Sequence, residues 1–85
     1  MDFIKAGKIT HYFDKIGVAV LVITDETLKV GDEVRIGEFE TGIEQKIDSM
    51  QVDHKAVSTA KVGDEVGLKV KTAVKSGDIV YKINQ

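Results

Sequence analysis

The chain has 85 residues, of which 42% are hydrophobic and 31% charged, and its formal net charge is −2. A chain of this length is expected to fold as one domain over residues 1–85, because neither half would bury a workable core. The small acidic excess argues against avid, non-specific binding of nucleic acid. Cysteine is absent, which excludes disulfides and thiol chemistry and fits a reducing, cytoplasmic setting.

The sequence also lacks the signals that direct a chain to a membrane. Its longest apolar run covers residues 16–23 and is too short to span a bilayer. The N-terminus shows no basic stretch followed by an apolar region and a small-residue cleavage site. We therefore expect a cytoplasmic protein that makes no membrane contact.

The distribution of apolar residues predicts short β-strands and no helix. Strands are expected over residues 8–13, 18–24, 33–36, 43–52, 65–71 and 79–83. In the first strand, Ile9, His11 and Phe13 share one face. In the fourth, the apolar side chains change face, and a β-bulge near residues 48–49 would bring them all to one core. In the fifth, alternation places Val66, Leu68 and Val70 inward and Gly67, Lys69 and Lys71 outward.

A repeated Gly-Asp pair precedes three of these runs. Residues 29–34 recur letter for letter at 61–66, and a looser copy occupies residues 75–80. The pairs are Gly31-Asp32, Gly63-Asp64 and Gly77-Asp78. Glycine takes the positive φ of a tight turn, and aspartate can bond nearby backbone amides. Three carboxylates could also hold a divalent cation, but a barrel distributes such turns around its rim, so separate structural turns are expected. The pattern favours a small β-barrel or sandwich.

The order of these parts resembles domain 2 of translational GTPases such as elongation factor Tu. In that family a Leu-x-x-Gly-Asp turn precedes a Val-x-Ser-x-x-x-x-His strand, matched here by residues 28–32 and 47–54. An Ala-x-x-Gly-Asp-x-Val-Gly turn and a final Gly-Asp-x-Val strand follow, matched by residues 60–67 and 77–80. The resemblance covers the chain from about Gly7 to Ile83. It implies a six-stranded antiparallel β-barrel of the reductase/elongation factor common-domain type, also called the translation protein type.

Two departures limit what this resemblance implies. The chain has neither the Gly-x-x-x-x-Gly-Lys-Ser/Thr loop that cradles phosphates nor a guanine-reading Asn-Lys-x-Asp, so no GTP binding is expected. The Gly-Arg-Gly-Thr-Val-like stretch of the elongation factors is replaced by residues 15–19, which contain no arginine. In those factors the domain helps to hold the aminoacyl end of tRNA, and this departure argues against inheritance of that site.

The histidines do not suggest catalysis. His11 and His54 have no partners at metal-ligand spacing, so no metal site is expected. Asp53 and His54 could form an acid–base pair, but no nucleophile accompanies them, and His54 is expected to cap or pack a connection. The chain is therefore expected to be neither an enzyme nor the holder of a cofactor.

Lysines in the second half of the chain are candidate RNA contacts. The candidates are Lys55, Lys69, Lys71 and Lys82. If the strands that carry Lys69, Lys71 and Lys82 were neighbours, these side chains would form a basic stripe. Aromatic rings for base stacking are sparse. The alternative is an ordinary solvated lysine face.

Residues 18–23 are apolar on both faces of one strand, although a lone barrel should leave one face in water. Ala19, Leu21 and Ile23 are predicted to point outward, where the N-terminal residues 1–6 or another chain would cover them. This surface is the candidate protein interface. The sequence thus predicts a non-catalytic binding module that contacts RNA, the ribosome or the translation machinery. The alternative is a module that docks onto a separate enzyme such as a peptidase, as related barrels at the C-terminus of collagenase-type peptidases suggest, or that forms a homo-oligomer.

Overall fold

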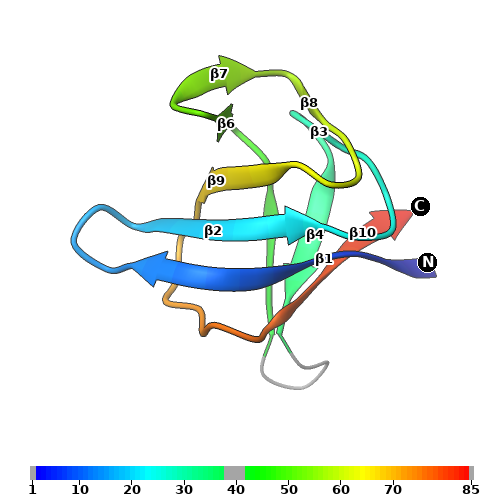
Figure 1. Cartoon of the computed structure of the whole chain (residues 1–85). Coiled ribbons are helices and arrows are strands. Elements are labelled where there is room, and N and C mark those ends of the chain that lie inside the picture. The colour runs from blue at the N-terminus through cyan, green and yellow to red at the C-terminus, as the bar shows by residue number, and fades with distance from the viewer. Residues whose placement is uncertain (1, 38–41, 85) are drawn as a thin grey trace.

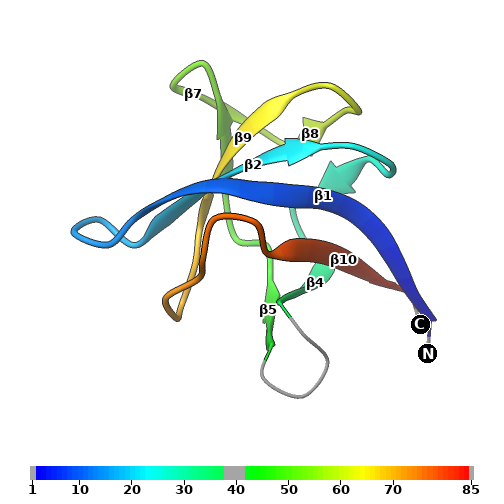
Figure 2. The ribbon, with the colours of Figure 1, turned by 60° about the horizontal axis from the view of Figure 1, so that its bottom comes forward.

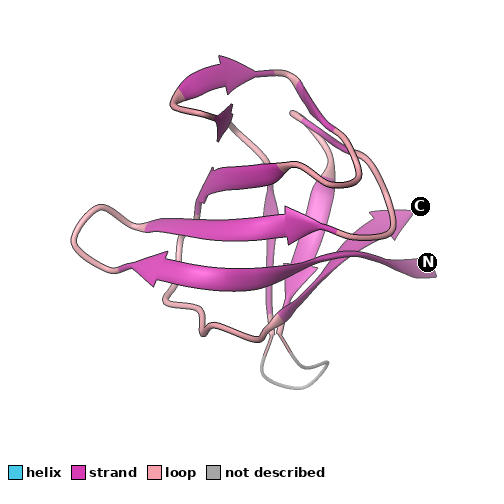
Figure 3. Ribbon diagram, in the orientation of Figure 1, coloured by secondary structure: helices cyan, strands magenta, loops and turns pink. Residues whose placement is uncertain are grey.

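The computed structural model describes residues 2–37 and 42–84, and every regular element in these ranges is a β-strand (Figure 3). The ten strands are β1 (Asp2–Phe13), β2 (Val18–Ile23), β3 (Leu28–Lys29), β4 (Glu33–Ile36), β5 (Ile43–Lys46), β6 (Met50–Val52), β7 (Lys55–Val57), β8 (Thr59–Ala60), β9 (Glu65–Lys69) and β10 (Ile79–Asn84). Eight of them form one antiparallel sheet in the order β5-β4-β10-β1-β2-β9-β6-β7, and β3 pairs with β8. The sheet curls around the core as a barrel-like domain (Figures 1 and 2), which confirms the predicted fold class.

The long strand β1 is the spine of this sheet, because its first half pairs with β10 and its second half with β2. Its register shifts twice, between Lys5 and Gly7 and between Ile9 and His11. Such bulges bend a strand and increase its twist. Gly7 lies at the bend, where a Cβ atom would stand 2.3 Å from the backbone oxygen of Val22. Only glycine permits that approach of β1 to β2.

The three predicted Gly-Asp turns are present and nearly identical. Gly31, Gly63 and Gly77 have φ values of 98°, 96° and 97°. In each turn the aspartate carboxylate accepts a 2.9 Å hydrogen bond from the backbone N–H of the lysine three residues earlier. A backbone bond runs the other way, from the aspartate N–H to the lysine carbonyl. The prediction of separate structural turns is consistent with this geometry, since each carboxylate serves its own turn.

Each turn is also fastened to a buried isoleucine on a neighbouring segment. The glycine N–H donates to the isoleucine carbonyl and the isoleucine N–H donates to the aspartate carbonyl, at 2.7–2.9 Å. The partners are Ile47 for the turn at Gly31, Ile23 for Gly63 and Ile9 for Gly77. All three isoleucines are buried. The repeated sequence therefore encodes one local arrangement, used three times to anchor a turn to a buried segment of the core.

The predicted orientation of β2 is wrong. Ala19, Leu21 and Ile23 are buried in the core, whereas the outward residues are Val18, Val20 and Val22. The cause lies in β9, whose inward Val66 and Leu68 were predicted correctly. Leu21 pairs with Val66 and Ala19 with Leu68, and paired residues of antiparallel strands share a face. The N-terminal segment does not cover the outward face either, because residues 2–5 pair with β10.

The predicted single face for Ile9, His11 and Phe13 is also wrong. Ile9 is buried, whereas His11 and Phe13 are exposed with ring centroids 6.3 Å apart. The register shift between Ile9 and His11 inverts the alternation at that point. Tyr12 consequently packs against the core in place of Phe13.

The predicted strand over residues 43–52 is two strands joined by a corner. β5 pairs with β4, whereas β6 pairs with β7 and β9. Ile47 and Met50 nevertheless both reach the core. The buried Gln45 side chain spans the gap between β5 and the end of β9, donating to the Lys69 carbonyl at 2.9 Å and accepting from the Lys71 N–H at 3.0 Å. A side-chain amide thus replaces backbone pairing where the barrel closes.

Candidate interaction surface

The outward face of β2 carries apolar side chains that the chain itself only half covers. Val18, Val20 and Val22 alternate with the buried residues of the strand. Across the sheet, Val18 is paired with Lys69, Val20 with Gly67 and Val22 with Glu65. The sheet therefore presents valines beside a position that has no side chain.

A groove of about 360 Å³ runs over this face. We call it the β2 groove, and it is lined by Phe13, Ile16, Val18, Val20, Gln51, Asp53, His54, Glu65 and Gly67. Three strands contribute to it, because Val20 and Gln51 both pair with Gly67 from opposite sides. Gly67 is thus the floor of the groove, with β2 and β6 as its flanks.

One end of the β2 groove is apolar and projects from the barrel. Phe13 and Ile16 belong to the hairpin that joins β1 to β2, and they are 50% and 65% exposed. The tip of this hairpin extends beyond the other strands in both ribbon views (Figures 1 and 2). Large apolar side chains held together in water on a projecting hairpin are a feature of interaction surfaces.

The other end of the groove is polar. Asp53 and His54 form the two-residue turn between β6 and β7, where Val52 pairs with Lys55. Both turn residues have positive φ, 52° and 63°, as a type I′ hairpin turn requires. His54 is exposed at this turn. With Glu65, Asp53 gives this end two carboxylates, and no lysine or arginine lines the groove.

The structure does not bring the candidate RNA-contact lysines into one stripe. Strands β9 and β10 are separated in the sheet by β1 and β2, so Lys69 and Lys71 are not beside Lys82. The Lys82 ammonium lies 3.5 Å from the Asp32 carboxylate, in an ion pair. Lys55 belongs to β7, at the far edge of the sheet. The condition on which the stripe depended is therefore not met.

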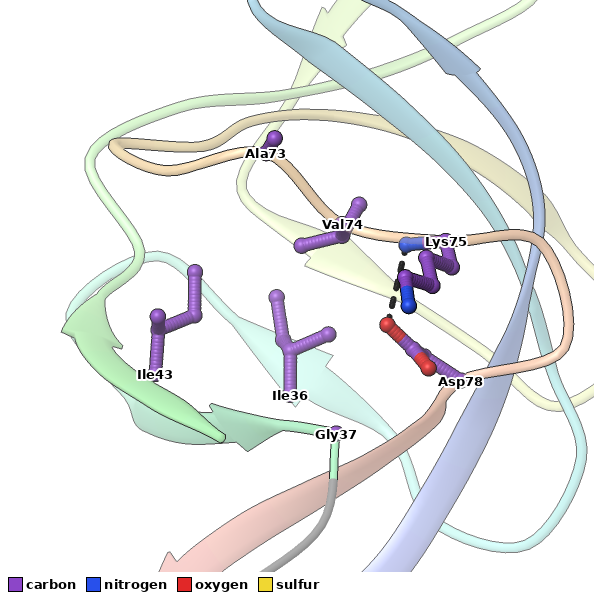
Figure 4. Close-up of a pocket in the computed structure, with 7 residues that line it drawn as sticks. All are labelled: Ile36, Gly37, Ile43, Ala73, Val74, Lys75 and Asp78. Carbon is purple, nitrogen blue, oxygen red and sulfur yellow. Dashed lines mark hydrogen bonds between the residues drawn. The ribbon is translucent and has the colours of Figure 1, made fainter. Parts of the chain in front are cut away.

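A second hollow of about 380 Å³ lies at one end of the barrel (Figure 4). Ile36, Ile43 and Val74 converge on it from different segments, and Lys75 and Asp78 stand at its edge. The Asp78 carboxylate is already bonded to the Lys75 N–H in the third turn. This hollow opens onto the core beside the third Gly-Asp turn.

No group of three or more His, Asp or Glu side chains in residues 2–37 and 42–84 is arranged to hold a metal ion. Within the same ranges, no helix is long and apolar enough to cross a membrane.

The chain is similar in sequence to parts of two proteases. It is 36% identical over 83 residues to an uncharacterized protease of Methanocaldococcus jannaschii, a match that covers 96% of this chain and 20% of the relative. It is 32% identical over 80 residues to the collagenase of Porphyromonas gingivalis, covering 93% of this chain and 22% of the relative. The chain thus spans about a fifth of the length of the curated relatives it matches. No protein-family model matches it.

Solved structures share the fold at lower identity. The C-terminal domain of the putative U32 peptidase of Geobacillus thermoleovorans superposes with a TM-score of 0.86 at 23% identity, covering 94% of this chain and 92% of that domain. GDP-bound aIF5B of Aeropyrum pernix superposes with a TM-score of 0.78 at 17% identity, covering 95% of this chain and 16% of that one. The chain therefore has a barrel fold that occurs both in a peptidase C-terminal domain and within a translation factor. Its relatives in sequence are proteases.

Sequence reasoning missed the residues that shape the β2 groove. Phe13 and Ile16 were not recognised as exposed, because the bulge that turns Phe13 outward leaves no mark in the apolar pattern. Gly67 offered a signal, since it is a glycine at an outward position in a strand interior, between Glu65 and Lys69. Gln45 offered a signal for a different feature, the closure of the barrel, as a polar residue on the inward face between Ile43 and Ile47.

Proposed function

We propose that this chain is a non-catalytic binding module that works with a peptidase. The observation that carries the proposal is the confinement of the sequence similarity. More than nine tenths of this chain matches about one fifth of each of two proteases. A domain of the same fold stands at the C-terminus of a protein described as a U32 peptidase. The remaining four fifths of such proteases have room for a separate catalytic part.

The use of the polar side chains supports a non-catalytic role. The carboxylates of Asp32, Asp64 and Asp78 are bound to the backbone of their own turns. The Gln45 amide is occupied in closing the barrel. His11 lies beside Phe13, and His54 belongs to a hairpin turn. These groups hold the fold or sit at its surface.

The β2 groove is the surface that this module would use. It joins an apolar end on a projecting hairpin to an acidic end, over a floor that lacks a side chain. A barrel with this surface can hold a polypeptide beside a catalytic domain or fasten the barrel to that domain.

An exchange experiment tests the proposal. In the Methanocaldococcus jannaschii protease, the matched segment would be deleted or replaced by this chain, and hydrolysis of a labelled denatured protein would be measured. We expect the deletion to slow hydrolysis and this chain to restore it at least in part, whereas this chain alone hydrolyses nothing. Hydrolysis by the isolated chain, or a chimera as slow as the deletion, would contradict the proposal.

Contact with RNA or the ribosome is a second candidate, supported by the fold shared with aIF5B and by exposed Lys55, Lys69 and Lys71. Such contact would weaken steeply with salt, because phosphate contacts release counterions. Binding of ribosomal RNA that disappears between low and high salt would favour this candidate. If no ribosomal RNA bound at low salt, this second candidate function would be rejected.

A further inference from the structure

Gly67 is a glycine that the fold does not require. Gly31, Gly63 and Gly77 are needed for their positive φ, and Gly7 for the close approach of a neighbouring strand. Gly67 has neither reason. Its φ is outside the left-handed region, and an added Cβ would meet its nearest neighbours, Val18 Cγ1 and the Gln51 oxygen, at 3.7 and 3.9 Å, which is ordinary contact.

Its position makes the glycine costly. Gly67 is the middle residue of β9, paired with Val20 on one side and Gln51 on the other, with no register shift at either pair. Glycine in a strand interior is less favourable than a residue with a side chain. When no bulge or bend explains it, such a glycine marks a place where a ligand or another backbone comes close to the sheet.

The β2 groove shows what lies above this glycine. Gly67 forms its floor, between the hairpin that carries Phe13 and Ile16 and the turn that carries Asp53 and His54. Because Gln51 stands opposite Gly67, the turn that follows β6 lies at the Glu65 end of β9. The groove therefore runs from an apolar end to an end with two carboxylates.

The charges around the groove select one kind of occupant. Asp53 and Glu65 line one end beside His54, and no lysine or arginine lines any part of the groove. Lys69 is paired with Val18 at the apolar end, where it would repel a second cation. A basic group is thus favoured beside Asp53 and Glu65, and an uncharged apolar group is favoured beside Phe13 and Ile16.

We infer that the β2 groove binds an extended polypeptide segment whose backbone crosses Gly67, with an apolar side chain at the hairpin end and a basic one at the Asp53–Glu65 end. Lys69, at the apolar end of the groove, and Glu65, at the acidic end, are four residues apart on β9. That separation is about 13 Å, so the apolar and basic residues of an extended ligand would also be four apart. The inference deepens the proposed function and rests on it, because a peptidase module meets polypeptide as substrate.

The test is a titration of the whole 85-residue chain with a peptide, monitored by two-dimensional NMR. The probe is the peptide acetyl-Thr-Leu-Thr-Ser-Thr-Lys-Thr-amide, and matched peptides replace its Lys with Glu or its Leu with Ser. We expect amide shifts to change at Gly67, Val20 and His54. The probe should bind about tenfold or more tightly than either matched peptide, the factor that one well-placed ion pair or buried side chain supplies.

Two variants make the test specific to the groove. Gly67→Val fills the floor without straining the backbone and should abolish binding with an unchanged or higher Tm. The control variant Thr59→Val introduces a valine at an exposed position of β8, outside the groove. This variant should bind the peptide as the native chain does. The double variant Asp53→Asn, Glu65→Gln should lose the preference for Lys over Glu while keeping a folded spectrum.

Three results would overturn the inference. The first is equal binding by Gly67→Val and the native chain, and the second is a set of shifted amides away from the groove. The third is self-association without peptide, seen both as concentration-dependent sedimentation and as concentration-dependent shifts of the groove amides. That result would assign the groove to a second copy of the chain. A failed titration beside an exchange experiment that succeeds would reject the peptide ligand and leave the peptidase module standing.

Discussion

The two faces of the β2–β9 pair are built from similar residues and differ in burial. On the inner face, Leu21 meets Val66 at full burial, whereas on the outer face Val20 meets Gly67 at half burial. The inner pair fills space and the outer pair leaves it open. Apolar character alone thus does not separate the core from the candidate interaction surface. The two faces are distinguished by the side-chain volume that the partner strand contributes opposite each residue of β2.

The largest contrast should come from polar substitutions on the two faces of β2. Leu21→Glu buries a carboxylate that has no partner, and the domain should unfold, since the cost exceeds the several kcal/mol that hold such a small domain together. Val20→Thr on the outer face should change the unfolding free energy by less than about 1 kcal/mol. Circular dichroism with thermal melts compares the two. A folded Leu21→Glu variant would contradict the assignment of faces.

A smaller loss of stability is expected from substitution of Gln45, whose side chain closes the barrel between β5 and β9. Gln45→Leu keeps the volume but removes both bonds from the amide to the backbone at Lys69 and Lys71. Because the partly buried carbonyl of Lys69 and N–H of Lys71 lose their partners, we expect a loss of about 2 kcal/mol in unfolding free energy. Urea denaturation measures it, with Gln45→Glu at low pH as the near-isosteric control. An unchanged midpoint for Gln45→Leu would show that the amide bridge is not needed.

Two glycines should respond with opposite signs. Gly63→Ala forces a side chain into a φ of 96° with nothing nearby to relieve or worsen the strain, so it should destabilise by about 1–3 kcal/mol. Gly67→Ala should stabilise by about 0.5–1 kcal/mol, because it removes a glycine from a strand interior. Both are measured by denaturant unfolding. Destabilisation by Gly67→Ala would mean that the fold itself needs this glycine.

The smallest effect is expected at the surface. Lys82→Met removes the ion pair with Asp32, whose atoms are 3.5 Å apart, and leaves the carboxylate bonded to its own turn. We expect a change of less than about 1 kcal/mol that shrinks as salt is added. Melts at low and high salt test this, and Lys55→Met, which leaves the pair between Lys82 and Asp32 intact, is the matched control. A large change that persists in high salt would make this pair part of the structural core.

The sequence predicts the repeated parts of this fold well. The three Gly-Asp turns, the inward Val66 and Leu68, and the all-β antiparallel architecture follow from local chemistry that acts within a few residues. Glycine sets φ, aspartate reaches its own turn, and alternation sets the face of a strand whose two sides differ. The resemblance to translation factors predicts the barrel for the same reason, since it rests on these local signatures.

The candidate interaction surface could not be predicted from the sequence, because it depends on the register of strand pairing. Alternation along β2 gives two apolar faces and no direction, and only its pairing with β9 decides that Leu21 is inside. The bulge in β1 turns Phe13 outward without any glycine or proline to announce it. The predicted stripe of lysines is absent for a similar reason. The order of strands in the sheet separates Lys69 from Lys82, and that order depends on contacts between residues far apart in the sequence.

The central claim is that the outer face around Gly67 serves a peptidase. The most direct measurement is hydrolysis of a denatured protein by the chimera in which this chain replaces the matched segment of the Methanocaldococcus jannaschii protease, with and without Gly67→Val. Hydrolysis of a short fluorogenic peptide is followed in parallel as a measure of the catalytic part. We expect Gly67→Val to slow hydrolysis of the protein severalfold, to leave the short peptide unaffected and to leave the Tm unchanged or higher. Equal hydrolysis of the protein by both chimeras would contradict the claim.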